Sequence, residues 1–279
     1  MVELNDFDIH YEVHGQGPVV LVVPNSWGLS LAGLRGIFGS LEQKLTLIYF
    51  DPRGMGGSSE IRHEADMGLA AVREDFQALR EHIGIESANA IGWSNGATNL
   101  ILLAAERPET IASAVFLHGM ASYTNKDMTA LAARYPGMIE ASTAFNQEIQ
   151  NPKLTTDDKT EKMRAMWLEQ WFPMSFADRE KASENLERIF REAEFSWSHA
   201  DYSQRAYPTI DLRDQLAAIT ARCLVISGAH DMMPASKGED LADGIPNARF
   251  VLFEKSGHYA PAEEPQAFED LVYTFFEVN

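Results

Sequence analysis

Cysteine is almost absent from this chain of 279 residues, which holds a single one, Cys223. One thiol cannot form an intramolecular disulfide, so the fold does not depend on oxidation and suits a reducing compartment. Cys223 lies in the apolar run of residues 222–227. There we expect a buried structural thiol rather than a nucleophile.

Long apolar runs and basic charge are also scarce. No apolar stretch approaches the roughly 18 residues that cross a bilayer, and the acidic N-terminus lacks the basic-then-apolar order of a secretory signal. Lys and Arg number 23 against 41 Asp and Glu, a net charge of −18. That charge repels nucleic-acid phosphates and anionic lipids, and otherwise serves solubility. We predict a cytoplasmic monomer or homodimer whose partner is a small molecule, with no nucleic acid and no membrane.

Strand and helix signals alternate along much of the chain. Short β-branched runs such as Val19–Val23 are typical of parallel strands buried on both faces. Apolar residues recur at helical spacing over 68–83, where Gly84 provides a C-terminal cap. This alternation predicts an α/β fold with a mostly parallel sheet covered on both faces. Strands are predicted at residues 7–14, 19–23, 45–50, 88–93, 111–117, 223–227 and 249–253, and helices at 68–83, 95–106 and 263–277.

The segment from about residue 121 to 207 breaks this alternation. It contains no convincing buried strand and is rich in helix formers, aromatic residues and methionines. We therefore predict a helical insertion between two strands of the sheet. The length of the chain suits such a core domain with a substantial insertion.

Gly92-Trp93-Ser94-Asn95-Gly96 fits the G-x-S-x-G pattern of a nucleophile elbow. In such an elbow, a sharp turn from strand to helix pushes the serine out above the sheet edge, and a Cβ at either glycine would clash. The alternative is an ordinary glycine-bounded turn. A predicted strand before Ser94 and a predicted helix after it favour the elbow.

A serine hydroxyl needs a base, and the base is usually histidine. His258 is the strongest candidate because its loop, Lys255-Ser-Gly-His-Tyr-Ala-Pro261, follows the last predicted strand and so lies at the same sheet edge as Ser94. The alternative is a surface loop histidine. Five other histidines lie in strands, a loop, a helix end or the insertion: His10, His14, His63, His82 and His199.

A buried carboxylate best orients such a base. Asp231 ends the turn after the strand at 223–227, which places it beside the His258 loop. The chain order Ser, Asp, His is that of one class of hydrolases. Three rival acids precede that strand and are expected to face the wrong end: Asp201, Asp211 and Asp214. His118 and His230, both at strand ends, could line the site, but a structural role is expected for each.

The oxyanion of a tetrahedral intermediate needs hydrogen-bond donors. One is the backbone N–H of Asn95, directly after the nucleophile. The second is expected from the loop after Val19–Val23, with Ser26 preferred over Asn25 and Trp27. This chemistry requires no cofactor and no metal, and none is predicted.

Over nearly its whole length the sequence resembles the α/β-hydrolase superfamily, most closely the branch of proline iminopeptidases and related cap-bearing esterases and lactonases. The resemblance rests on Asp51-Pro-Arg-Gly-Met-Gly-Gly-Ser58, the elbow at Ser94, the run 224–231 and Gly257-His258. It implies Ser94, Asp231 and His258 as the catalytic triad. It also implies an eight-stranded sheet with a helical cap inserted after the sixth strand, dividing the chain into core 1–120, cap 121–208 and core 209–279.

Two departures disfavour an iminopeptidase. Such enzymes usually carry His-Gly-Gly-Pro-Gly where this chain has Pro24-Asn-Ser-Trp-Gly28, and Gly-Gly-Ser-Trp-Gly where it has Gly92-Trp-Ser-Asn-Gly96. Epoxide hydrolases and haloalkane dehalogenases of the same fold need a carboxylate at the position of Ser94. They are therefore excluded.

Aromatic and methionine side chains in the insertion, Trp167 and Trp171 among them, either pack the insertion onto the core or line a pocket for an apolar substrate. We expect Trp27, Trp93, Trp167 and Trp171 to contact substrate. Six glutamates are expected to form a solvated face, although one or two turned inward would bind a substrate ammonium: Glu161, Glu169, Glu184, Glu187, Glu192 and Glu194.

The preferred function is hydrolysis of a carboxylic ester or lactone of a small, largely apolar molecule. An iminopeptidase-like aminopeptidase is the second choice. The third hypothesis is a receptor that keeps the pocket but turns its ligand over slowly, against which the complete triad argues.

Overall fold

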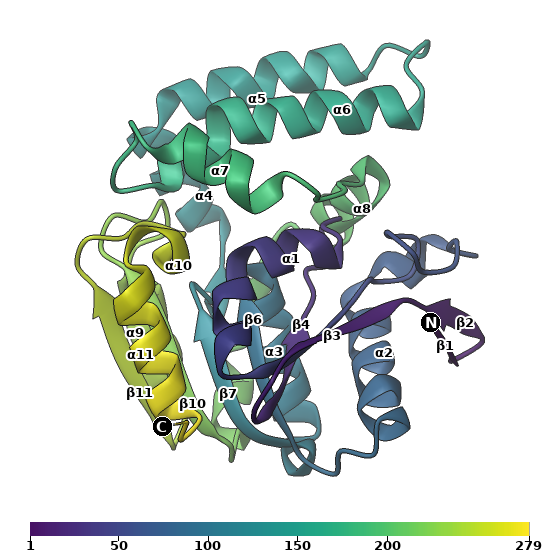
Figure 1. Cartoon of the computed structure of the whole chain (residues 1–279). Helices are drawn as coiled ribbons and strands as arrows, with labels where there is room; N and C mark the ends of the chain where they lie inside the picture. Colours follow the sequence, from purple (N-terminus) through teal and green to yellow (C-terminus); the bar gives the residue numbers. More distant parts are fainter. Residues whose placement is uncertain (279) are drawn as a thin grey trace.

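The computed structural model describes residues 1–278, and its centre is a seven-stranded sheet with the order β11-β10-β7-β6-β4-β5-β3 (Figure 1). β3 runs antiparallel to β5 at one edge, and all other neighbours are parallel. The mostly parallel α/β sheet is thus confirmed. The strands are β3 (Tyr11–Gly15), β4 (Val19–Val23), β5 (Thr46–Phe50), β6 (Ala88–Trp93), β7 (Ile111–Leu117), β10 (Arg222–Gly228) and β11 (Ala248–Phe253).

The sheet has one strand fewer than the eight expected, and the N-terminus explains the difference. β1 (Val2–Leu4) and β2 (Phe7–Ile9) pair only with each other, as a separate two-stranded sheet. Asn5 and Asp6 between them both have positive φ, the geometry of a tight hairpin turn. The predicted strand at 7–14 is therefore two strands, and only β3 joins the main sheet.

Helices cover both faces of the sheet, because successive strand residues point to opposite sides. Val20 and Val22 of β4 pack with α1 (Leu31–Phe38) and α11 (Pro265–Phe275). Leu21 and Val23 pack on the other face with α2 (Leu69–His82), α3 (Asn95–Glu106) and α9 (Ser236–Gly244). Short 3₁₀ turns complete the core: η1 (Gly39–Gln43), η2 (Glu64–Met67), η3 (Pro108–Thr110) and η6 (Arg213–Ala218).

The closing helix differs from its prediction, because two helices replace the one expected at 263–277. These are α10 (Ala260–Glu263) and α11. Glu264 between them has φ −132° and ψ 58°. A residue before proline avoids the helical region, and proline lacks the N–H that would continue the helix. Pro265 therefore ends α10 and begins α11.

The chain between β7 and β10 is helical. It leaves and returns through a short antiparallel pair, β8 (Ser122–Tyr123) and β9 (Ile210–Asp211). We call residues 124–206 the helical segment; Figure 1 shows its helices above the sheet. They are α4 (Asn125–Arg134), α5 (Pro136–Ile149), α6 (Thr156–Met166), the π-turn η4 (Trp167–Trp171), the 3₁₀ turn η5 (Phe172–Ser175), α7 (Ala182–Phe190) and α8 (Trp197–Ala206). The division into core and cap domains stays a prediction.

Asp51, in the motif at 51–58, has a structural role, because its hydrogen bonds connect segments of the core. Its carboxylate accepts hydrogen bonds from the backbone N–H groups of Leu31 (2.7 Å) and Gly57 (3.0 Å) and lies 2.8 Å from Nδ1 of His10. These bonds fix the start of α1 against β5 and the N-terminal strands.

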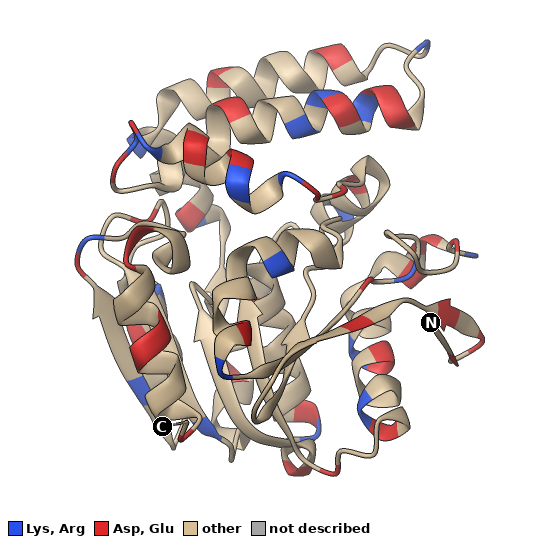
Figure 2. Ribbon diagram, viewed as in Figure 1, with Lys and Arg blue, Asp and Glu red and all other residues tan. Residues whose placement is uncertain are grey.

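Charged side chains lie on the outer helices and loops of both the sheet region and the helical segment, with acidic and basic groups interspersed (Figure 2). The central strands are largely uncharged. Cys223 is buried in β10, as predicted, and burial raises the pKa of its thiol to about 12. Within residues 1–278, no helix combines the length and the apolarity needed to cross a membrane.

Candidate active site

Four polar side chains follow four neighbouring parallel strands. Ser94 comes directly after β6, His118 after β7, Asp231 after β10 and His258 after β11, and these strands lie in the order β11-β10-β7-β6. Because the carboxyl ends of parallel strands share one edge of a sheet, residues up to 164 positions apart in the chain lie at the same edge.

Ser94 occupies a strained turn. Its φ of 55° and ψ of −119° lie outside the regions that non-glycine residues prefer. A Cβ on Gly92 would stand 2.5 Å from the carbonyl oxygen of Gly96, and a Cβ on Gly96 would stand 2.5 Å from that of Val23. Both glycines are therefore required for the turn, which leaves Ser94 half-buried at the start of α3.

The side chains of His258 and Asp231 meet in the structure. Nδ1 of His258 lies 2.7 Å from Oδ2 of Asp231, and Oδ1 of Asp231 accepts the N–H of Met233 at 3.1 Å. A nitrogen that faces a carboxylate carries the proton, so Nε2 of His258 is left as the acceptor. This is the tautomer that a general base needs.

Contacts through Trp93 bring His258 next to the elbow. Trp93 precedes Ser94, its Nε1 donates to the main-chain oxygen of His258 at 3.0 Å, and its ring centroid lies 5.2 Å from that of the imidazole. Burial alone would raise the pKa of Asp231, but His258 and His118 lower it well below its ordinary value. The two imidazoles thus favour the ionised carboxylate of Asp231.

His118 is the member of this group whose position the sequence did not explain. Its ring is fully buried, with Nδ1 3.1 Å from Oδ2 of Asp231 and its centroid 4.9 Å from that of His258. Neither ring nitrogen has an aligned hydrogen-bond partner within residues 1–278. Its place at the end of β7 was the available signal. His230, in contrast, is exposed.

Replacement of His118 by leucine should change how stability depends on pH. Burial lowers the pKa of His118 below 6.5, so below about pH 6.5 the unfolded chain binds a proton that the folded chain does not. The wild type therefore loses stability as pH falls through that range, and the variant lacks this loss. From pH 7.5 to 5.5, the variant's free energy of unfolding should rise relative to wild type by about 1 kcal/mol.

Urea unfolding at the two pH values measures this difference. The strain of leucine at a φ of 52° is independent of pH and cancels in the comparison. If the free energies of unfolding of the variant and the wild type differ by the same amount at both pH values, His118 takes up a proton as readily in the folded chain as in the unfolded chain, which would contradict the prediction.

Of the two residues expected to supply oxyanion donors, Ser26 is engaged by the side chain of Asn95. The N–H and Oγ of Ser26 both donate to Oδ1 of Asn95, at 2.7 and 2.8 Å. Oδ1 of Asn25 accepts the N–H of Gly96 at 2.9 Å, and Nδ2 of Asn99 donates to the carbonyl of Pro24 at 2.8 Å. The loop is thus fixed to the start of α3, while the side chain of Asn95 occupies the acceptor position at Ser26.

Three of the four tryptophans expected to contact substrate form one cluster. The ring centroid of Trp27 lies 6.4 Å from that of Trp93 and 5.1 Å from that of Trp167. Trp167 begins the π-turn η4, a distortion that is frequent at functional sites. Phe172 and Phe195 extend the cluster around Trp27.

Trp171 packs half-buried at the margin of the same apolar core. Its buried Nε1 has no hydrogen-bond partner within residues 1–278.

The glutamates considered as ammonium ligands all have exposed side chains: Glu161, Glu169, Glu184, Glu187, Glu192 and Glu194. Two rival acids are engaged with arginines, Asp201 with Arg205 and Asp211 with Arg213, and Asp214 is exposed.

His118, Asp231 and His258 also form a group of metal-ligand type, with their ligand atoms within 4.8 Å of one another. Sequence spacing does not reveal this group, because each residue follows a different strand. A cation there would replace the proton that His258 shares with Asp231. The group therefore cannot bind a metal and support proton transfer at once.

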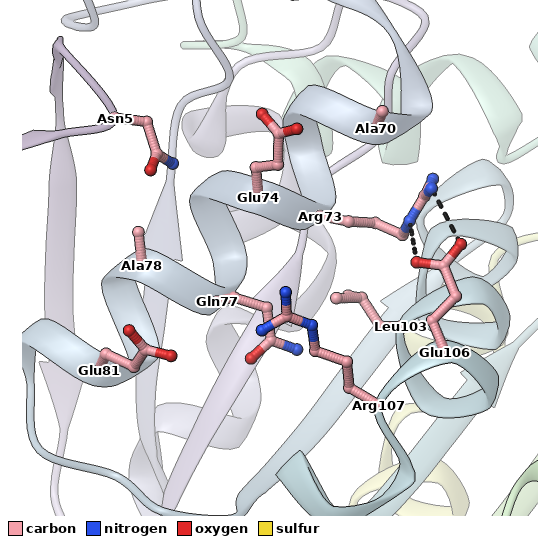
Figure 3. Close-up of a pocket in the computed structure, with 10 residues that line it drawn as sticks. All are labelled: Asn5, Ala70, Arg73, Glu74, Gln77, Ala78, Glu81, Leu103, Glu106 and Arg107. Atoms are coloured by element: carbon pink, nitrogen blue, oxygen red, sulfur yellow. Dashed lines mark hydrogen bonds and ion pairs between the residues drawn. The ribbon is translucent and has the colours of Figure 1, made fainter.

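A concave region of about 400 Å³ lies between α2 and α3, away from these residues (Figure 3). Arg73 and Glu106 are paired across it at 2.9 and 3.0 Å, with Glu74, Glu81 and Arg107 around them. It borders the end of α3 opposite Ser94, about 15 Å along the helix. Its charges are exposed or already paired, so it offers no convergent set of reactive groups.

Comparison with known proteins identifies the family of the fold. The family described as alpha/beta hydrolase fold matches residues 19–265. The chain is 27% identical over 270 residues to 3-oxoadipate enol-lactonase 2 of Acinetobacter baylyi, covering 96% of this chain and 92% of the relative.

Solved structures share the fold. The enol-lactonase of Burkholderia xenovorans superimposes with a TM-score of 0.73 at 20% identity, covering 99% of both chains. The proline iminopeptidase of Mycobacterium smegmatis gives a TM-score of 0.68 at 19% identity, covering 98% of this chain and 96% of that one.

Proposed function

The chain belongs to the alpha/beta hydrolase fold family, and we propose that it is a serine hydrolase of carboxylic esters or lactones. The observation that supports this most strongly is the 2.7 Å contact between His258 and Asp231 beside the elbow that carries Ser94. A nucleophile, a base and a carboxylate at one sheet edge are the groups that acyl transfer requires.

In the proposed reaction, Oγ of Ser94 attacks the carbonyl carbon while Nε2 of His258 takes the hydroxyl proton. Asp231 stabilises the resulting imidazolium. Collapse of the tetrahedral intermediate breaks the bond to the leaving alkoxide, which receives that proton. Water then attacks the acyl-enzyme with His258 again as the base, releasing the acid and restoring Ser94; a lactone would yield a hydroxy acid.

The backbone N–H groups of Asn95 and Ser26 are the proposed donors to the oxyanion. In the structure Oδ1 of Asn95 takes the hydrogen bonds of Ser26. We propose that this side chain turns away when the substrate carbonyl enters. The amide oxygen is then a competitor of the substrate for the same donor.

Replacement of Asn95 by alanine should therefore accelerate reaction of Ser94 with a fluorophosphonate. The gain should be about fivefold, equivalent to the roughly 1 kcal/mol of one hydrogen bond that no longer has to be broken. Asn99→Ala is the control, because it loosens the same loop without touching Ser26, and it should not accelerate the reaction. Slower labelling of Asn95→Ala would contradict the proposal.

The surroundings of Ser94 favour a largely apolar substrate. Trp27, Trp93 and Trp167 form an aromatic cluster beside the elbow. Trp93 is fully buried and supports the cluster from below, so we propose that the half-buried Trp27 and Trp167 contact the acyl or leaving group, with Trp171 at their margin. The named function of the enol-lactonase relative supports a lactone or ester. The exposed glutamates of the helical segment offer no buried partner for a substrate ammonium, which disfavours an aminopeptidase.

Values of kcat/KM on a p-nitrophenyl acyl ester, an acyl lactone and a prolyl anilide test the choice of substrate. We expect the ester or the lactone to be preferred by at least about tenfold, since one decade corresponds to only about 1.4 kcal/mol of transition-state binding. A clear preference for the anilide would overturn the assignment in favour of an aminopeptidase.

We further propose that the helical segment acts as the cap and that the protein works in the cytoplasm on a small molecule.

A further inference from the structure

We propose that Glu263 is a positioning residue that fastens the loop carrying the catalytic base to the helical segment, so that the helical segment determines where His258 lies. We call residues 254–259 the His258 loop. The inference rests on the proposed role of His258 as the base. It adds a residue that touches neither substrate nor the reacting atoms.

The carboxylate of Glu263 bridges two parts of the chain that are far apart in sequence. Its Oε1 accepts the backbone N–H of Ala177 at 2.7 Å, and its Oε2 accepts that of Gly257 at 2.7 Å. Ala177 lies between η5 and α7 of the helical segment, and Gly257 directly precedes His258. One half-buried side chain therefore holds both segments through short hydrogen bonds to a charged acceptor, the strong kind.

The same two segments also touch directly. The N–H of His258 donates to the carbonyl oxygen of Ser175 at 2.7 Å. A Cβ on Gly257 would stand 1.8 Å from that oxygen, so glycine is needed for the close approach. The rings of Phe176 and Tyr259 stack at 4.4 Å and 13°, and both are buried.

These contacts place His258 between two supports. Asp231 and Trp93 hold it from the side of the sheet. From the other side, Ser175 of the helical segment accepts the N–H of His258, and Glu263 accepts the N–H of Gly257. Glu263 belongs to α10, which lies close to the helical segment (Figure 1). A base must keep hydrogen-bond distance to its nucleophile, and a displacement of about 1 Å is enough to lower the rate strongly. Movement of the helical segment is thereby coupled to the position of the imidazole.

Glu264 provides a matched control. Its Oε2 accepts the N–H of Lys255 at 3.1 Å and the hydroxyl of Ser256 at 2.7 Å. Both partners lie in the His258 loop. Glu264→Gln therefore makes the same chemical change next to the same loop without altering the bridge from Glu263 to Ala177.

The test compares Glu263→Gln with Glu264→Gln. A glutamine has only one acceptor oxygen, so its NH₂ must face either Ala177 or Gly257, both of which are donors. Backbone hydrogen exchange in Glu263→Gln should therefore rise at whichever of Ala177 and Gly257 loses its acceptor, which breaks the bridge. The maximal rate at which a fluorophosphonate labels Ser94 should fall about 10-fold, within the range of small displacements of a base, with little change in the half-saturating concentration. Glu264→Gln, whose one amide oxygen can still accept from both Lys255 and Ser256, should leave exchange at Ala177 and Gly257 unchanged and label within about twofold of wild type, as expected if the imidazole keeps its place.

Three results would overturn the inference. They are a wild-type labelling rate in Glu263→Gln, exchange that stays unchanged at both Ala177 and Gly257, and equal effects of the two variants. Exchange and the NMR signal of the His258 Nδ1 proton need no reactive serine. If the wild type fails to label, the proposed function fails. The bridge would still be supported if the Nδ1 signal is altered in Glu263→Gln and not in Glu264→Gln. An unaltered signal in Glu263→Gln would refute it.

Discussion

Replacement of Ser94 by alanine is expected to lower kcat for ester hydrolysis by about 10⁴- to 10⁶-fold, the range found when a nucleophilic serine is removed. Ser94 is the side chain presented by the strained turn between Gly92 and Gly96. Alanine leaves that turn, the aromatic cluster and the His258–Asp231 pair in place but provides no oxygen for attack. The measurement is kcat on a p-nitrophenyl acyl ester, with wild type and variant compared at the same concentration of folded protein.

The fold of this variant is expected to survive, because alanine at a φ of 55° is no more strained than serine. The control is an unfolding temperature within a few degrees of that of the wild type. A change of about 1 kcal/mol in the free energy of unfolding shifts this temperature by only about 2–4 °C in a chain of this size. A kcat within tenfold of wild type in a folded Ser94→Ala protein would remove Ser94 from the reaction.

Asp231→Asn should lower kcat by about 10⁴-fold, as a wrongly oriented tautomer does in other Ser-His-Asp hydrolases. The asparagine NH₂ would face Nδ1 of His258, which must then act as the acceptor. The ring proton moves to Nε2, where it blocks uptake of the proton from Ser94. The substitution nearly preserves size, so the effect reports charge and tautomer rather than packing.

Stability at acid pH gives an independent check on the same variant. The pKa of Asp231 is lowered in the folded chain, so its stabilising effect is present above the unfolded pKa of about 4 and is lost as pH falls further. The stability gap between wild type and Asp231→Asn should therefore narrow below about pH 4. An activity within tenfold of wild type, or a gap that widens with acid, would contradict the assigned carboxylate.

The parts of the fold that the sequence predicts best are those in which local pattern and burial agree. β6, α3 and β7 have the bounds expected from their continuous apolar runs. The N-terminal hairpin was missed because its turn is formed by Asn5 and Asp6, whose positive φ leaves no periodic signal. The closing helix was predicted as continuous because its apolar spacing passes through Pro265, although the proline itself marked the break.

The residues of the candidate site also fall into those that the sequence predicts and those that only the folded chain reveals. Strand order along the chain was enough to bring Asp231 and His258 to one edge, since each follows a parallel strand. His118 satisfies the same criterion but was assigned a structural role, because nothing local to it differs from a core histidine. Glu263 could not be predicted, because its two partners, Ala177 and Gly257, meet only when the helical segment folds over the sheet. The turn of Asn95 toward Ser26 is likewise a tertiary feature.

Covalent labelling of wild-type protein by a fluorophosphonate tests the central claim most directly. Intact mass and peptide mapping should show one adduct per chain, on Ser94, and the adduct should be absent from Ser94→Ala. No adduct on folded wild-type protein, or an adduct that persists in Ser94→Ala, would contradict an activated serine at this elbow and would favour a binding protein that uses the same fold.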